Sequence, residues 1–276
     1  MMRYICFLLL PLVLITSGCT KKDDPKQEEP GKVIVLMYHR IVEGEATNLY
    51  ERSLEDLESD LKYLKNNNIK IISFTDLEEF SKKQSIGEGN YAIITFDDGD
   101  SSWYTLVRQL LINYQAKATF FLWTYKIGSD SFMRWDEVEN MSHYQSKGGI
   151  RPFTFGSHSY SHTYLYDSRN RYETLDEYRE FLDYELGVSR EIIEQYTPGE
   201  VNVFSLPFGN GAGDPEIIAA AQRNGYKFIR TSLWSAIDNT NLDLMVIPSL
   251  PMLDSTEPDL IGYYLGFGSK RVKNFV

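Results

Sequence analysis

The chain has few cysteines, and both of them lie near its N-terminus. Only Cys6 and Cys19 occur among 276 residues. The remainder of the chain therefore cannot form a disulfide and must be held together by its own core. Of the whole chain, 42% is apolar and 14% aromatic. Because roughly 240 residues of this composition can bury a sizeable core, we expect a single domain over residues 33–276.

The chain also lacks an excess of positive charge. Its 28 basic residues are outnumbered by 39 acidic ones, which gives a net charge of −11. Binding to the phosphates of nucleic acid requires a basic face, so we expect no nucleic-acid partner. A neutral or cationic ligand is compatible with this charge, and we expect the protein to be a monomer.

No apolar run is long enough to cross a membrane. Residues 5–15 are apolar and follow Arg3, but they are too few for a membrane span and are typical of a signal peptide. They lead into TSGC, residues 16–19, which resembles the end of a bacterial lipoprotein signal. We expect cleavage after residue 18 and acylation of Cys19, although Thr16 replaces the usual aliphatic residue. The alternative is an ordinary signal peptide that leaves Cys19 without a lipid.

Residues 19–32 are rich in charge and contain two prolines, so they are predicted to be a flexible tether. A lipid on Cys19 would hold the exported domain at the membrane surface of the bacterial cell envelope.

Beyond the tether, apolar strand patterns alternate with helical ones. Strands are expected over residues 33–38, 69–73, 91–96, 118–123, 153–156, 201–206, 227–230 and 245–249. Helices are expected from Ser53, from Thr75 with Glu78 as its capping-box partner, and over residues 102–114, 135–143, 174–195 and 214–224. This alternation predicts a parallel sheet covered by helices, and seven or eight such units predict a β/α barrel.

Chemically reactive residues follow the predicted strands. In a β/α barrel, the carboxyl ends of the strands carry the active groups. The residues at these positions are His39, Asp97, Asp98, His158, Pro207, Phe208 and Trp234. We therefore expect them to lie on one rim of the barrel.

Two adjacent carboxylates and two imidazoles could hold one divalent metal and leave a carboxylate free as a base. Taken alone, the DDG of residues 97–99 is an ordinary turn signal, and the two histidines of HSYSH, residues 158–162, could simply be exposed. Both segments end strands, however, and they contain two of only four histidines in the chain. Together they indicate a metal-dependent hydrolase.

Three motifs resemble those of a known family. TFDDG at residues 95–99, SHSYSH at 157–162 and FSLPFG at 204–209 are similar to the first three motifs of the polysaccharide deacetylases with a NodB-type domain, which form carbohydrate esterase family 4. Residues 133–141 also resemble the helix before the family's histidine motif. VLMYHRI at 35–41 is similar to the branch that acts on partly deacetylated biofilm polymers, above all poly-β-1,6-N-acetylglucosamine. The resemblance runs from about Val33 to the C-terminal region and implies a distorted β/α barrel.

The resemblance also implies the roles of individual residues. Asp97 would be the general base, and the metal ligands would be Asp98, His158 and His162. Zinc suits this set best, although cobalt, nickel or iron would also fit. The backbone N–H of Phe208, together with the metal, would hold the oxyanion. Pro207 would rigidify that loop, or alternatively would only end its strand.

The chain departs from the family pattern in two places. Ser205 stands where many members have an arginine that orients the catalytic aspartate. In addition, no histidine follows His162, whereas the family's late Leu-x-His segment protonates the departing amine. Because a barrel closes on itself, His39 after the first strand is the predicted replacement acid. The alternative is that His39 only caps its loop.

Tyr160 and Trp234 are predicted to contact the acetyl methyl group or a sugar face, although any one of 19 tyrosines is more often a core or surface residue. The predicted function is removal of N-acetyl groups from an N-acetylglucosamine polymer, with release of acetate. The alternatives are an O-acetyl esterase acting on xylan-type polymers and a catalytically degenerate, carbohydrate-binding lipoprotein.

Overall fold

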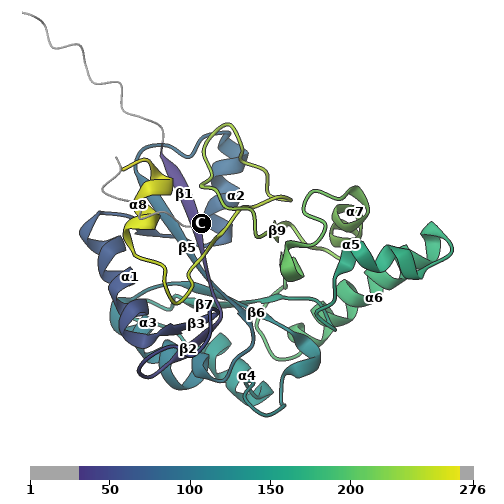
Figure 1. Ribbon diagram of the computed structural model, residues 1–276, viewed down its shortest axis with the longest axis horizontal. Helices are drawn as coiled ribbons and strands as arrows, with labels where there is room; N and C mark the ends of the chain where they lie inside the picture. Colours follow the sequence, from purple (N-terminus) through teal and green to yellow (C-terminus); the bar gives the residue numbers. More distant parts are fainter. Residues whose placement is uncertain (1–30, 268–276) are drawn as a thin grey trace, which may run out of the picture.

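The computed structural model describes residues 31–267, which form one curled sheet with helices on its outer side (Figure 1). The predicted signal peptide, Cys19 and nearly all of the predicted tether lie outside the described residues. The strands of the main sheet are β1 Lys32–Tyr38, β4 Lys70–Ile71, β5 Asn90–Asp98, β6 Ala118–Leu122, β7 Phe153–Ser157, β8 Val203–Ser205, β9 Phe228–Arg230 and β10 Leu250–Pro251.

The strands follow the order β10-β1-β5-β6-β7-β8-β9, with β4 on the side of β5, and every pair is parallel. The connections carry the helices α1 Leu54–Asn66, α2 Phe74–Lys83, α3 Arg108–Tyr114, α4 Trp135–His143, α5 Leu165–Ser168, α6 Leu175–Glu194, α7 Pro215–Arg223 and α8 Asp259–Leu265. The predicted distorted β/α barrel and its single domain are therefore confirmed.

Side chains that point into the barrel change from apolar to polar along the strands. Because residues alternate between the faces of a strand, Val33 and Val35 of β1 face inward, and so does Ile93 of β5. They pack with Phe121 and Phe228 in an inner cluster distinct from the outer core. Further along β5, β8 and β9, toward the carboxyl end of each strand, the inward positions are Asp97, Ser205 and Arg230. The polar site thus lies at the carboxyl ends of the strands, next to the inner apolar cluster that fills the barrel.

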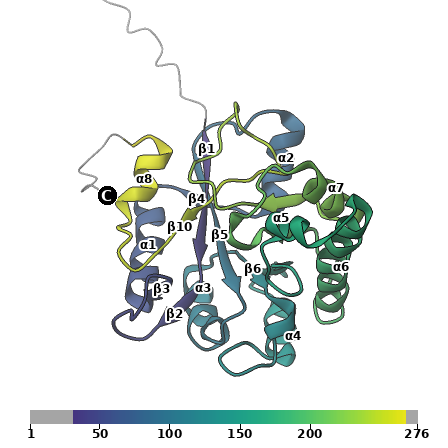
Figure 2. The ribbon, with the colours of Figure 1, turned by 45° about the vertical axis from the view of Figure 1, so that its right-hand side comes forward.

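The predicted last strand is wrong by a few residues. Only Ile247 of the predicted span 245–249 makes a bridge, with Arg230, and the paired strand is β10 just after it. Within residues 31–267, β9 and β10 form no continuous ladder, because the irregular segment between them crosses to the amino end of the strands, where Ile237 bridges Val33 (Figure 2). This break is what distorts the barrel.

Two helix starts also differ from expectation. Ser73 caps α2 and forms a capping box with Asp76, so the predicted cap at Thr75 with Glu78 is wrong. Since residues 72 and 73 enter this cap, β4 keeps only two residues. The predicted helix 102–114 begins as a π-helix, η1 Trp103–Val107, and continues as α3.

A buried ion pair fixes the end of β1, next to His39. Arg52, from the short strand β3 Glu51–Ser53, donates to both carboxylate oxygens of Asp60, at 2.7 and 2.8 Å. The Tyr38 hydroxyl donates to the same carboxylate, and Arg52 also donates to the carbonyl of Leu253 beyond β10. The first and last strands are therefore joined on the side of the barrel that presents His39. Among the described residues, no helix is long and apolar enough to span a membrane.

Candidate active site

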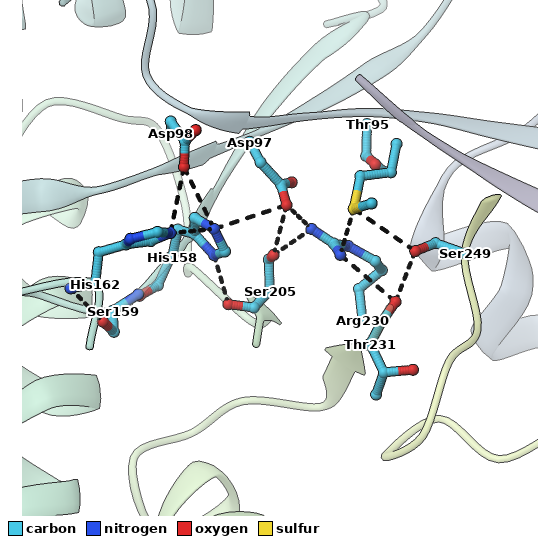
Figure 3. Close-up of polar contacts among 12 residues, drawn as sticks. Thr95, Asp97, Asp98, His158, Ser159, His162, Ser205, Arg230, Thr231 and Ser249 are labelled. Carbon is cyan, nitrogen blue, oxygen red and sulfur yellow. Dashed lines mark hydrogen bonds and ion pairs between the residues drawn. The ribbon is translucent and has the colours of Figure 1, made fainter. Parts of the chain in front are cut away.

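Four of the predicted site residues, Asp97, Asp98, His158 and His162, converge at the carboxyl ends of the strands (Figure 3). Asp97 and Asp98 end β5, and His158 and His162 follow β7. His158 Nε2 lies 3.5 Å and His162 Nε2 lies 3.4 Å from Asp98 Oδ1, and the two imidazole nitrogens are 3.0 Å apart. The predicted grouping of Asp98 with both histidines is therefore present.

This triangle has the dimensions of a metal site. A cation about 2.0–2.1 Å from each atom of a tetrahedral ligand set separates those atoms by about 3.3 Å. Asp98 Oδ1 is buried and has no hydrogen-bond partner among the described residues, as expected of a ligand atom. His158 Nδ1 lies 2.8 Å from the carbonyl of Ser205, which fixes the tautomer that leaves a lone pair on Nε2. The donor set fits a zinc-like ion.

Burial keeps both imidazoles neutral, as metal binding requires. It lowers the pKa of His158 to about 3 and that of His162 to about 4, against the opposing charge of Asp97. Burial and the neighbouring Asp97 charge raise the pKa of Asp98 to about 7. The free site therefore holds more negative charge than it can stabilise by itself, which favours a cation.

Asp97 is held in a different way. One of its oxygens, Oδ2, receives a short ion pair from Arg230 and a hydrogen bond of 3.2 Å from the Ser205 hydroxyl. Burial would raise the pKa of Asp97, but the charge of Arg230 and its hydrogen bond outweigh burial and lower the pKa to about 2. The other oxygen, Oδ1, is buried and has no partner among residues 31–267.

Arg230 supplies the positive charge beside Asp97 that the sequence motifs did not assign to a residue. Position 205 carries a serine, as noted, yet Asp97, the predicted base, does not lack a guanidinium, because Arg230 reaches it from β9. Arg230 is fully buried between Phe121 and the Met37 sulfur, and it also contacts the Ser205 hydroxyl. An arginine that ends an apolar strand on the catalytic rim is the signal that could have identified it.

His39 lies on the same rim, directly after β1. The charges of Asp97 and Arg230 both act on it: burial and Arg230 lower the pKa of His39, and Asp97 opposes them. Its ring lies edge-on to Tyr50, and the Trp103 indole donates to its backbone carbonyl at 2.8 Å. The structure therefore places His39 in the electrostatic neighbourhood of the base.

Aromatic rings line the site around His162. Trp123 stacks on the His162 ring with centroids 4.7 Å apart, and Phe208 packs against it at 4.5 Å. Tyr164 in turn stacks on Phe208 at 4.1 Å, and both rings are about half exposed. Trp123 and Tyr164 were not predicted, since their neighbourhood depends on the path of the loop after β7.

The other residues predicted to bind the substrate are Tyr160, Trp234 and Pro207. Tyr160 packs edge-on against Tyr125 and Tyr184 at the outer side of the histidine loop. Trp234 is 56% exposed and follows Arg230 by four residues. Pro207 is buried at the start of the turn that carries Phe208. Sugar contacts by Tyr160 and Trp234 stay predictions.

Backbone strain collects at this site. Asp98 has a φ of 92°, and Ser159, His162 and Phe208 have φ values between 55° and 58°. Left-handed conformations of non-glycine residues cost about 1–3 kcal/mol each and persist only where the surroundings enforce them. Among residues 31–267, the Phe208 N–H donates to no carbonyl or side chain. This donor is free to bind a ligand oxygen.

The comparisons with known proteins agree with this geometry. The polysaccharide deacetylase family model matches residues 85–229, more than half of the chain. Over 211 residues the chain is 24% identical to YxkH of Bacillus subtilis (strain 168), which carries the polysaccharide deacetylase name; the match covers 75% of this chain and 68% of YxkH.

Solved structures share the fold at low sequence identity. The deacetylase PplD of Streptococcus pyogenes, solved in complex with acetate, superposes with a TM-score of 0.72 at 18% identity, over 86% of this chain and 99% of that one. A de-N-acetylase from Aggregatibacter actinomycetemcomitans gives 0.72 at 19% identity, over 85% and 100%. IcaB from Ammonifex degensii gives 0.70 at 18%, over 87% and 99%. With the family model matching more than half of its length, the chain belongs to the polysaccharide deacetylase family.

Proposed function

We propose that this protein is a metal-dependent deacetylase that removes N-acetyl groups from an N-acetylglucosamine-containing polysaccharide of the cell envelope. The observation that carries the proposal is that two adjacent carboxylates have different partners. Asp98 faces two neutral imidazoles, and Asp97 is anchored to Arg230 with one oxygen free. This arrangement supplies a cation site and a separate base within one pocket.

Asp98, His158 and His162 would hold the cation, most favourably zinc. When bound, the metal supplies Lewis acidity toward water and the acetamide carbonyl. Asp97 then has one task, which is to accept the proton of the attacking water through Oδ1. Because the pKa of Asp97 is about 2, this carboxylate stays ionised at neutral pH but is a weak base, so it would rely on the metal to lower the pKa of the water.

The oxyanion needs a donor fixed in advance. The free N–H of Phe208 meets this requirement, since its turn is set by buried Pro207 and by contact of the Phe208 ring with His162. A donor of this kind typically lowers the barrier by roughly 3–4 kcal/mol.

Amide cleavage also needs an acid, because an unprotonated amine anion is a very poor leaving group. His39 is the proposed acid: it would give its proton to the nitrogen as the C–N bond breaks. The products are acetate and a free amine on the sugar. The lowered pKa of His39 makes it a better donor to the departing amine, at the expense of the protonated fraction at neutral pH.

Relatives with similar folds support the substrate class. The structure from Aggregatibacter actinomycetemcomitans is described as a de-N-acetylase, and PplD was solved with acetate. The exposed rings of Phe208 and Tyr164 beside His162 offer the apolar surface that sugar faces and acetyl methyl groups bind. The rival reaction is O-deacetylation of xylan-type polymers. Its leaving group is an alcohol, which leaves more readily than an amine, so this reaction depends less on a general acid.

The first test measures acetate release from acetylated oligosaccharides of N-acetylglucosamine. We expect the purified protein to release acetate, a chelator to abolish release and zinc to restore it. Asp97→Asn should lower the rate about 10²–10⁴-fold while zinc binding persists, since only the base is lost. A protein that binds zinc but releases no acetate from any acetylated glycan would instead support a carbohydrate-binding role.

A second test concerns His39. We expect His39→Gln to slow acetate release from amide substrates by about 10²-fold or more, because the acid contributes mainly when the leaving group is an amine. Acetate esters of xylo-oligosaccharides should be affected much less. Equal losses on both substrates would contradict the proposed role of His39.

Arg230→Lys keeps the buried positive charge but removes the planar guanidinium that contacts Asp97 and Ser205 together. We expect a loss in kcat of about 10²-fold with little change in zinc affinity, because the base is misplaced and the metal ligands are not. Thermal unfolding of the variant provides the control for stability. Unchanged kcat would show that Arg230 does not orient the base.

Lipid anchoring of the domain through Cys19 is also part of the proposal. In a bacterial host, the wild-type chain should appear in the membrane fraction and incorporate an alkyne-labelled fatty acid. Cys19→Ala should lose the label and leave the membrane fraction, because no other cysteine follows the signal. A wild-type chain that carries no label would refute the anchor.

A further inference from the structure

One buried residue of α6, Glu185, holds the loop between the two histidines. Ser161, which directly precedes His162, donates its backbone N–H to Glu185 Oε2 at 2.8 Å and its hydroxyl to Oε1 at 2.6 Å. The carbonyl of Glu185 also accepts the N–H of Tyr160 at 3.0 Å. A single residue therefore satisfies three donors of the segment between His158 and His162.

Glu185 lies in a mostly apolar stripe of α6. The face of α6 that packs on the barrel consists of Tyr178, Leu182, Glu185, Leu186, Ser189 and Ile193. The Glu185 side chain is buried, and no Lys, Arg or His among residues 31–267 forms an ion pair with it. Burying a carboxylate without a counter-charge is unfavourable, so stability alone would favour an apolar residue at this position.

The second polar residue of this stripe acts on the other histidine. The Ser189 hydroxyl lies 2.7 Å from that of Ser157, which directly precedes His158, and 2.6 Å from that of Thr124. The Ser157 hydroxyl in turn accepts the N–H of Ser159 at 3.1 Å. Each histidine is thus preceded by a serine that is tied to α6.

The loop needs such support, because its own backbone is strained. Ser159 and His162 both have left-handed φ values, of 58° and 55°. The bond from the His162 N–H to the Ser159 hydroxyl, at 2.9 Å, closes the loop internally but does not attach it to the barrel. The contacts of Glu185 attach it from outside.

We infer that Glu185 is a positioning residue that holds His162 in the arrangement required for the metal site. This inference rests on the proposed metal-dependent function. It assigns to α6 a role in setting metal affinity, in addition to covering the sheet. Hydrogen-bond geometry carries the effect, since Glu185 contacts the loop through Ser161 and Tyr160 and reaches neither imidazole directly.

The test compares zinc affinity in four variants of the full-length protein, by competition with a chromophoric chelator. We expect Glu185→Ala to weaken zinc binding about tenfold or more, as typical for loss of an outer hydrogen-bond partner. Glu185→Gln should bind zinc nearly as tightly as wild type, because its amide can accept from the Ser161 N–H and donate to the freely rotating hydroxyl. Saturating zinc should restore most acetate release to Glu185→Ala.

Glu194→Ala is the matched control. Glu194 lies on the same helix and accepts the N–H of Val201 at 2.8 Å, so it also anchors a loop, but one away from the histidines. We expect this variant to lose thermal stability and to keep wild-type zinc affinity. Ser161→Ala, which removes only the hydroxyl bond, covers the case in which Glu185→Ala does not fold, and it should weaken zinc binding measurably.

Three results would overturn the inference. The first is folded Glu185→Ala with wild-type zinc affinity, or, if that variant does not fold, Ser161→Ala with wild-type affinity. The second is an equal loss in Glu194→Ala, which would indicate general destabilisation. A wild-type protein that binds no zinc would refute the proposed function as well, so failure of the two ideas can be told apart.

Discussion

The site depends on keeping two neighbouring carboxylates ionised inside a barrel. Asp97 and Asp98 are adjacent in sequence, and burial raises the free energy of each charged form. The fold resolves this conflict by separating their partners. Arg230 neutralises Asp97 from one side, whereas Asp98 faces two uncharged imidazoles and has no cation of its own among the described residues. The unmet charge at Asp98 is therefore what suits the pocket to the proposed metal.

This asymmetry follows from strand geometry. Asp97 points into the barrel like Ile93 and Thr95 before it, so it meets Ser205 and Arg230, which occupy inward positions at the same height. Asp98 should face outward by the same alternation, but its φ of 92° departs from strand conformation. The backbone thus turns at the end of β5 and brings Asp98 to the histidines. Local strain and function are linked at this one residue.

Sequence reasoning identified what is encoded in short segments. The apolar runs predicted the parallel strands, and the motif positions predicted that Asp98, His158 and His162 would meet. It did not identify Arg230 or Glu185, because their partners lie 133 and 24 residues away in the chain. The strand at 245–249 was misplaced because its pairing depends on how the irregular segment between β9 and β10 reaches β1. Contacts set by the packing of distant elements have no local signature.

The arrangement of the domain's two ends has a consequence for the order of catalytic groups. A side chain on Gly266, after α8, would touch the Lys32 ammonium at the start of β1, and α8 lies beside β1 (Figure 1). A circular permutation that joined these neighbouring ends and opened the chain after His39 would leave the rim unchanged. His39 would then come last, rather than first, among the predicted site residues in the sequence. The proposed chemistry therefore constrains where the acid lies around the barrel and leaves its place along the polypeptide free, as the proposed role of the early His39 requires.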